Sequence, residues 1–149
     1  MMFRLFLLFI CIASLPVQAA KITPAPPQVA ARAYIVMDAD TGKVIMASRE
    51  GERFPPASLT KMMTSYILEG ELTKGNVSKN DLVPVSVKAW RAPGSRMFIK
   101  EGTQVLLSDL LKGIIIQSGN DASVAVAEYI AGSEAAFADM MNQHAALLG

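Results

Sequence analysis

Residues 55–64 read PPASLTKMMT and place a serine and a lysine three positions apart at the start of a predicted helix. Positions three apart lie on the same face of a helix, so the side chains of Ser58 and Lys61 are expected to be neighbours. A serine hydroxyl becomes a nucleophile when a base removes its proton, and a lysine amine can serve as that base when its surroundings favour the neutral form. The spacing therefore indicates nucleophilic catalysis by Ser58, with Lys61 as its base.

The helix prediction rests on the residues around this pair. One apolar stripe with helical spacing is formed by Leu59, Met62, Met63, Tyr66 and Ile67. Pro55 and Pro56 stop any preceding helix and fix the start of this one. Ser58 is then expected in the first turn, where free backbone N–H groups and the helix dipole favour a developing negative charge. The alternative from this stretch alone is an ordinary surface serine and lysine on a packed helix.

A second polar segment, QSGNDAS at residues 117–123, separates two apolar helical segments. In a tight loop, Ser118 and Asn120 would present a hydroxyl and an amide on the same side. The hydroxyl could relay a proton, and the amide could hold a substrate carbonyl group. Serine, asparagine and aspartate are also the preferred N-cap residues, so a helix cap is the alternative interpretation. The two interpretations are compatible, because a capping residue can still face a cleft.

Together, the two segments resemble the first two of three motifs in the penicillin-binding proteins and serine β-lactamases. The amino-acid sequences of residues 56–66, 94–98 and 117–122 are similar to those of the low-molecular-mass D-alanyl-D-alanine carboxypeptidases. The resemblance runs from about Ala33 to the last residue. It implies an α+β fold of the β-lactamase/transpeptidase-like type, a helical cluster packed on part of an antiparallel sheet.

The resemblance also implies a reaction, in which a serine-type carboxypeptidase removes the terminal D-alanine from peptidoglycan stem peptides through an acyl-serine intermediate. Ser58 would be the nucleophile, Lys61 the base, Ser118 the group that passes a proton to the departing D-alanine, and Asn120 the substrate-binding residue. The implied ligands are the peptidoglycan pentapeptide and β-lactam antibiotics as acylating inhibitors. No cofactor, metal or nucleic acid is expected.

The third family motif, Lys-Thr-Gly on an inner strand, does not occur in the sequence. We therefore expect residues 33–149 to form the N-terminal part of a catalytic domain, so that the fold is incomplete, this chain alone is inactive and marginally folded, and membrane attachment depends on a missing C-terminal segment. One alternative is a class A-like β-lactamase, whose second motif usually carries aspartate where this chain has Gly119. The other is a non-catalytic penicillin-binding remnant or sensor.

The first twenty residues predict a secretory signal peptide. A short basic start, an apolar run from Leu5 to Leu15 and small residues at 17–20 fit that pattern. The run is too short to cross a bilayer, although an uncleaved anchor is the alternative. Export predicts a location in the periplasm or at the outer face of the cytoplasmic membrane. Residues 21–32 contain three prolines and are predicted to form an extended leader.

Composition narrows the chemistry further. With 149 residues the chain is one domain or part of one, and its net charge of +1 gives no indication of a nucleic-acid partner. The lone cysteine, Cys11, falls in the predicted signal peptide, so the mature chain would have neither a disulfide nor a cysteine nucleophile. His144 is the lone histidine, which argues against a Ser-His-Asp triad, and it is predicted to be solvated. One histidine, no cysteine in the mature chain and no spaced acidic cluster argue against a structural zinc site.

Hydrophobic periodicity and turn residues predict the remaining elements. Two strands at 33–37 and 43–47 should form a hairpin, and the Ser58 helix should end near Gly70 or Gly75. A strand-like stretch follows at 82–87, and then a loop at 90–96 that either tucks Trp90 into the core or lies at the edge of a cleft. Helices are predicted from residue 107, with Ser108 as a cap, and at 122–131 and 134–148, the middle one buried.

Overall fold

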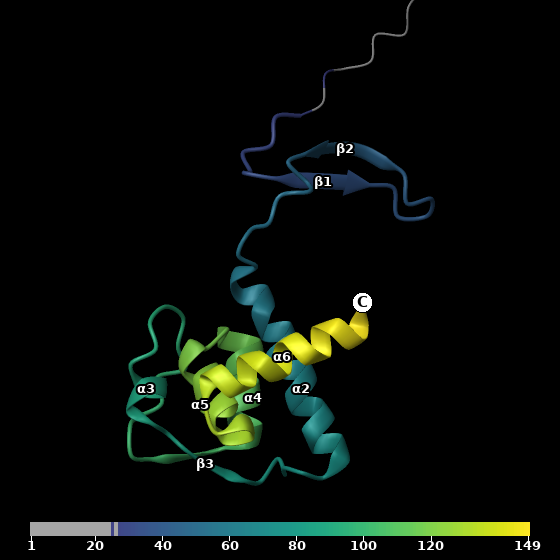
Figure 1. Cartoon of the computed structure of the whole chain (residues 1–149). Helices are drawn as coiled ribbons and strands as arrows, with labels where there is room; N and C mark the ends of the chain where they lie inside the picture. The colour runs from purple at the N-terminus through teal and green to yellow at the C-terminus, as the bar shows by residue number, and fades with distance from the viewer. Residues whose placement is uncertain (1–24, 26) are drawn as a thin grey trace, which may run out of the picture. The chain divides into compact units, whose positions relative to one another are not determined.

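The structure, a computed structural model, describes residue 25 and residues 27–149 (Figure 1). The predicted signal peptide, residues 1–20, lies outside the described residues. The chain divides into two compact units, with the boundary between Arg53 and Phe54. Within the described part of the chain, no helix combines the length and the apolar character needed to cross a bilayer.

The first unit contains the predicted hairpin, which is confirmed. Strands β1 (Tyr34–Met37) and β2 (Val44–Ser48) pair antiparallel, with a register irregularity between Val36 and Met37. In the turn, the Asp38 carboxylate accepts hydrogen bonds from the Thr41 hydroxyl at 2.6 Å and from the Thr41 N–H at 2.8 Å. These bonds hold the pKa of Asp38 below its ordinary value, and the bond from the Thr41 hydroxyl has the larger effect.

The second unit begins with a 3₁₀ turn, η1 (Ala57–Leu59), which runs into helix α2 (Thr60–Lys74). The helix ends as predicted at Gly75, whose φ of 75° is the left-handed conformation that glycine adopts readily. Its buried face consists of Thr64, Ile67 and Leu68.

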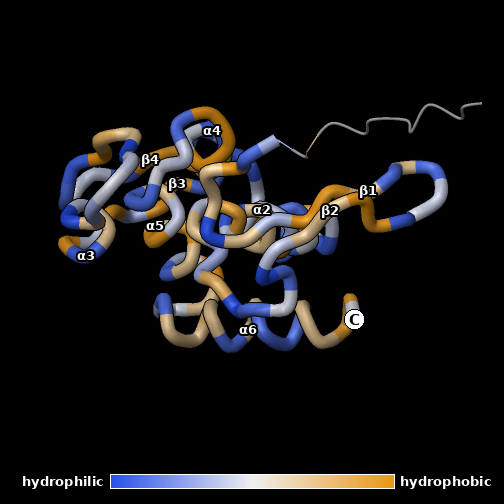
Figure 2. The backbone as a smooth tube through the Cα atoms, turned by 90° about the horizontal axis from the view of Figure 1, so that it is seen from above, coloured by the Kyte–Doolittle hydropathy of each residue, from blue (hydrophilic) through white to orange (hydrophobic). Residues whose placement is uncertain are grey.

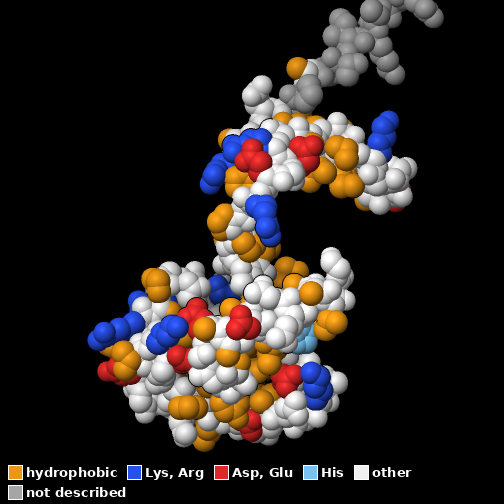
Figure 3. All heavy atoms as spheres, viewed as in Figure 1, with side chains coloured by type: hydrophobic (Ala, Val, Ile, Leu, Met, Phe, Trp, Pro, Cys, Tyr) orange, Lys and Arg blue, Asp and Glu red, His pale blue; other side chains and the backbone are white. Residues whose placement is uncertain are grey.

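The predicted apolar stripe of the Ser58 helix is only partly covered. Leu59, Met62 and Tyr66 are 68%, 70% and 51% exposed. The covered side of α2 includes Ile67 of the stripe together with Thr64 and Leu68, and the helix packs against α4, α5 and α6. Figure 3 shows hydrophobic side chains on the visible surface of this unit.

The remaining elements are two short strands and four helices. They are β3 (Leu82–Pro84), α3 (Val87–Trp90), β4 (Gln104–Leu106), α4 (Leu107–Gln117), α5 (Asn120–Ala131) and α6 (Glu134–Leu148). Strands β3 and β4 pair antiparallel, with Val83 opposite Val105. The three long helices confirm the predictions for 107 onward, 122–131 and 134–148, whereas α3 and β4 were not predicted.

The predicted cap at Ser108 is wrong. The N-cap of α4 is Leu106, without a side-chain hydrogen bond, because strand β4 runs directly into the helix. The backbone N–H groups of Leu107 and Ser108 donate instead to the carbonyl oxygens of Asp81 and Lys79. The segment before β3 thus supplies the acceptors that a capping side chain would otherwise provide.

Helix α5 is the centre of this unit and contacts α2, α3, α4 and α6 (Figure 1). Its residues Ala122, Ala125 and Val126 are fully buried, which confirms the predicted central helix. The main core surrounds them and contains Leu68, Val83, Val85, Ala89, Ile99, Leu107, Leu110, Leu111 and Ile114.

Helix α6 is amphipathic, and the tube in Figure 2 alternates between hydrophilic and hydrophobic colours along it. Phe137 is its buried anchor and packs with Ile67 and Ala127 in a second cluster. His144, predicted to be solvated, is half-buried and meets the Tyr66 ring edge-on, with ring centroids 5.8 Å apart.

Gly113 in α4 is required by packing. A Cβ atom there would lie 3.2 Å from Cγ and 3.3 Å from Cβ of Met97, and its contact with the Met97 sulfur would be closer still. We expect Gly113→Ala to lower the free energy of unfolding by about 1 to 3 kcal/mol, because Met97 must move. Thermal unfolding measures this change.

The matched control is Gly70→Ala in α2, where a Cβ atom would meet nothing within 4 Å. There, alanine should raise the stability by about 0.5 to 1 kcal/mol, the ordinary helix-interior difference between the two residues. Equal shifts in the two variants would contradict the packing argument.

Candidate active site

Ser58 lies in a turn set by the residues before it. Ala57 has a φ of 49°, in the left-handed region, and the Leu59 N–H donates to the Pro56 carbonyl oxygen at 3.1 Å. A non-glycine residue in this region costs about 1 to 3 kcal/mol, and such residues cluster at active sites. Ser58 is exposed and occupies the 3₁₀ turn that leads into α2, rather than the first turn of the α-helix itself.

Lys61, in the first turn of α2, joins the two motifs. Its Nζ atom donates to Ser58 Oγ at 3.5 Å and to Asn120 Oδ1 at 2.5 Å. The lysine is half-buried, and both of these partners are uncharged. Ser58 and Lys61 are neighbours, as predicted. The Lys61 amine also contacts Asn120, which lies 59 residues later in the sequence.

Asn120, the first residue of α5, is held by the loop that follows α3. Its Nδ2 atom donates to the Pro93 carbonyl oxygen at 2.5 Å, and its backbone N–H donates to the Ser95 carbonyl oxygen at 2.7 Å. A carbonyl oxygen only accepts, so the bond to Pro93 turns the amide nitrogen toward the loop and the amide oxygen toward Lys61. Gly94, with a φ of 86°, lets the loop approach, since a Cβ atom there would lie 2.8 Å from Asn120 Nδ2.

Ser118 ends α4 in the left-handed conformation, with φ 52° and ψ 41°. It is half-buried and lies two residues before Asn120. The N-cap interpretation of this segment is wrong, because the N-cap of α5 is Gly119, without a side-chain hydrogen bond. The Ser123 hydroxyl donates back to the Gly119 carbonyl oxygen at 2.7 Å.

A cavity of about 590 Å³ opens beside these groups. Ser58, Lys61 and Asn120 line it, whereas Ser118 is not among the described residues of its wall. Val124, Ala127, Phe137 and Met141, from α5 and α6, form an apolar side. The volume is typical of sites for small molecules and short peptides. The structure thus brings three of the four predicted site residues into one cavity.

The loop after Trp90 contributes Ala92 and Pro93 to the cavity wall. Trp90 itself is 36% exposed, and the Arg91 guanidinium lies 5.6 Å from its ring centroid. The loop therefore lies at the edge of the cavity, as one of the two sequence interpretations expected.

The sequence model of peptidase family S11, the D-alanyl-D-alanine carboxypeptidases, matches residues 20–149 of the chain. The chain belongs to this family. It is 46% identical to D-alanyl-D-alanine carboxypeptidase DacC of Escherichia coli over 137 residues, which are 88% of this chain and 34% of DacC. It is 43% identical to E. coli DacA over 132 residues, 85% of this chain and 33% of DacA. The chain spans about a third of the length of these curated relatives.

The chain is also similar in structure to solved members of this carboxypeptidase family. DacD from Francisella tularensis superposes with a TM-score of 0.71 at 42% identity, covering 89% of this chain and 32% of DacD. Penicillin-binding protein 5 from Haemophilus influenzae gives 0.72 at 40% identity, covering 85% of this chain and 38% of that chain. A β-lactamase from Xanthomonas campestris, 17% identical with a TM-score of 0.54, shares the fold alone and covers 72% of this chain and 39% of its own. The predicted fold class is confirmed as a partial transpeptidase-like domain.

Sequence reasoning missed one residue beside the candidate site, Asp121. Its carboxylate is fully buried and accepts hydrogen bonds from four backbone N–H groups. The available signal was an acidic residue at the predicted start of a helix, where such residues are favoured. Within the described residues, no group of three or more His, Cys, Asp or Glu side chains could hold a metal ion.

Proposed function

We propose that this chain carries the nucleophile and the base of a serine-type D-Ala-D-Ala carboxypeptidase, which removes the terminal D-alanine from peptidoglycan stem peptides. The observation that carries the proposal is the position of Lys61 Nζ, 3.5 Å from Ser58 Oγ and 2.5 Å from Asn120 Oδ1, at one cavity. Membership of the carboxypeptidase family supports the reaction class.

Acylation begins when Ser58 Oγ attacks the carbonyl carbon between the two terminal D-alanines and Lys61 Nζ takes the hydroxyl proton. The backbone N–H of Ser58 gives half of the oxyanion hole, worth about 3 kcal/mol of transition-state stabilisation. When the tetrahedral intermediate collapses, the C–N bond breaks and the amine of D-alanine leaves with a proton. Water then hydrolyses the ester and restores the Ser58 hydroxyl.

Asn120 holds the peptide backbone of the substrate. A side-chain amide has two N–H donors, and Pro93 takes one of them, so the second is available for a substrate carbonyl group. The Asn120 amide oxygen accepts a hydrogen bond from Lys61 Nζ. Asn120 therefore has one donor free for substrate while its orientation is fixed by protein groups.

Ser118 passes the proton to the departing amine. Its position two residues before Asn120 supports this role, which requires the hydroxyl to turn toward the cavity when substrate is bound. Catalytic hydrogen bonds are often long or unaligned before substrate binds and tighten in the complex.

The proposed ligands are the peptidoglycan pentapeptide as substrate and β-lactam antibiotics, which acylate the same serine. The predicted signal peptide supports export to the periplasm or to the outer face of the cytoplasmic membrane. The residue at position 119 disfavours a class A-like β-lactamase, whose motif usually carries aspartate there. A Cβ atom at Gly119 would lie 3.0 Å from Asp121 Oδ1 and 3.3 Å from the Gly113 carbonyl oxygen. An aspartate at position 119 would have to displace these oxygens.

The test is to label the protein with fluorescent penicillin and to map the adduct by mass spectrometry. It uses the 149-residue chain and a chimera in which this chain replaces the matching third of E. coli DacC, called the DacC chimera below. We expect the chimera to carry one adduct, on Ser58, and to release D-alanine from a D-Ala-D-Ala peptide. An adduct on Ser65, Ser95 or Ser118 would refute the assignment, and labelling without D-alanine release would indicate a sensor.

A further inference from the structure

The Asp121 carboxylate is the most heavily hydrogen-bonded side chain beside the site. Its Oδ1 atom accepts from the N–H groups of Met97 at 3.0 Å and Ala122 at 2.9 Å. Its Oδ2 atom accepts from Phe98 at 2.8 Å and Ile99 at 3.2 Å. Three consecutive N–H groups of one loop therefore converge on one buried carboxylate.

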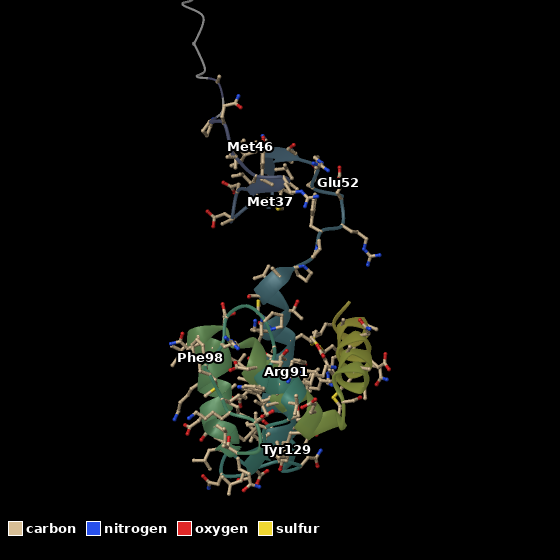
Figure 4. All side chains as sticks on the ribbon, turned by 90° about the vertical axis from the view of Figure 1, so that its left-hand side faces the viewer. Met37, Met46, Glu52, Arg91, Phe98 and Tyr129 are labelled. Atoms are coloured by element: carbon tan, nitrogen blue, oxygen red, sulfur yellow. The ribbon has the colours of Figure 1, made fainter. Side chains whose placement is uncertain are left out.

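This convergence needs an irregular backbone. Phe98 has a φ of 65°, in the left-handed region, where a bulky residue is disfavoured. Its side chain is 73% exposed and lies at the margin of the helical unit (Figure 4), with the Arg96 guanidinium 5.0 Å from the ring centroid. Packing of the Phe98 ring therefore does not explain the conformation, whereas the three hydrogen bonds to Asp121 do.

The other end of the same loop holds the proposed substrate-binding residue. The carbonyl oxygens of Pro93 and Ser95 accept from the side-chain and backbone N–H groups of Asn120. A Cβ atom at Gly94, between them, would lie 2.8 Å from Asn120 Nδ2, so a side chain there would displace the amide. Residues 93–99 are thus tied to two adjacent residues of α5, at one end through Asn120 and at the other through Asp121.

We propose that Asp121 is a positioning residue, which clamps residues 93–99 and thereby keeps the Asn120 amide oxygen on Lys61. If the loop moved away, Asn120 would lose both carbonyl partners, and its amide could rotate. Lys61 would then lose the acceptor that holds its amine beside Ser58. The consequence for catalysis rests on the proposed function, whereas the clamp itself does not.

Asp121→Asn is the sharpest variant, because it keeps the size and shape of the side chain. An amide has one accepting oxygen, and its NH₂ group would face two N–H donors. At most two of the four hydrogen bonds can therefore survive. A carboxylate that only stabilised the helix start would need the Ala122 bond, yet three of the four bonds go to the loop.

The experiment measures hydrogen exchange and the Asn120 side-chain signals by NMR in the DacC chimera, because the 149-residue chain alone is expected to be marginally folded. In the wild type we expect slow exchange at Met97, Phe98 and Ile99 and at the Asn120 side-chain proton bonded to Pro93. In Asp121→Asn these sites should exchange about 10- to 100-fold faster, as expected for lost buried hydrogen bonds. The Asn120 side-chain signals should move toward those of a free asparagine.

Two controls separate the clamp from general destabilisation. Asp109→Asn removes a half-exposed carboxylate from α4, and Val126→Ala truncates a fully buried residue of the main core without removing a hydrogen bond to the loop. Both should leave the Asn120 signals in place. Unchanged Asn120 signals in Asp121→Asn would overturn the proposal, as would free-asparagine exchange in the wild type, a result that does not depend on whether the variant folds.

In the DacC chimera, Asp121→Asn should slow penicillin acylation about 100-fold, the scale of a small misplacement of reacting groups. Val126→Ala, compared at equal fractions folded, should not. Near-wild-type acylation in Asp121→Asn would also overturn the proposal. If the wild-type chimera is not acylated while the Asn120 signals respond as expected, the proposed function fails and the clamp stands.

Discussion

Replacing Ser58 with alanine is expected to abolish penicillin labelling of the DacC chimera. The covalent bond needs the Oγ atom, which Lys61 Nζ approaches to 3.5 Å, and no other group can take its place in the ester. Removing the nucleophile of a serine hydrolase costs on the order of 10⁶-fold in turnover. Gel fluorescence after incubation with fluorescent penicillin measures the loss, and intact-protein mass spectrometry confirms the missing adduct.

Ser65→Ala is the matched control, because Ser65 lies on α2 in the same part of the chain and is half-buried. It should leave labelling at the wild-type level. Ser58 is exposed, so circular dichroism of the alanine variant should match the wild type. An adduct that persists in Ser58→Ala would assign the acylated residue elsewhere.

Local sequence signals predicted the elements with strong periodicity or turn chemistry. The hairpin, the end of α2 at Gly75 and the three later helices all agree with the structure. The periodicity of α2 identified the helix and Ile67 of its buried face, whereas the pattern does not say how much of the apolar stripe α4, α5 and α6 will cover. The short elements α3 and β4, with four and three residues, carry too few positions for a periodic signal.

The candidate site also contains contacts that the sequence predicts and contacts that it does not. Ser58 and Lys61 are three residues apart on one turn, so their contact follows from helix geometry. The contact of Lys61 with Asn120 spans 59 residues and was not predicted, although the family resemblance assigned both residues to one site. The carbonyl oxygens of Pro93 and Ser95 were beyond prediction, because every residue carries the same backbone group and the sequence does not mark which ones will serve.

Replacing Lys61 with arginine is expected to lower the acylation rate of the DacC chimera by about 10²- to 10⁴-fold, the usual contribution of a general base. Arginine keeps the positive charge but does not give up its proton in proteins. If Lys61 acts as the base for Ser58, the charge alone cannot rescue the reaction. Stopped-flow acylation with a fluorescent penicillin measures the rate, and circular dichroism checks the fold.

Lys61→Ala separates the two tasks of the amine, because it removes both the base and the donor to Asn120 Oδ1, which lies 2.5 Å from Nζ. Arginine can still donate to that oxygen and alanine cannot, so equally slow acylation by the two variants would assign the defect to the lost base rather than to the lost donor. Lys112→Arg on α4, where the lysine is 67% exposed and pairs with Asp109, is the matched control and should react at the wild-type rate. Near-normal acylation by Lys61→Arg with an unchanged spectrum would show that a cation at this position suffices, and the proton would then have to leave Ser58 by another route.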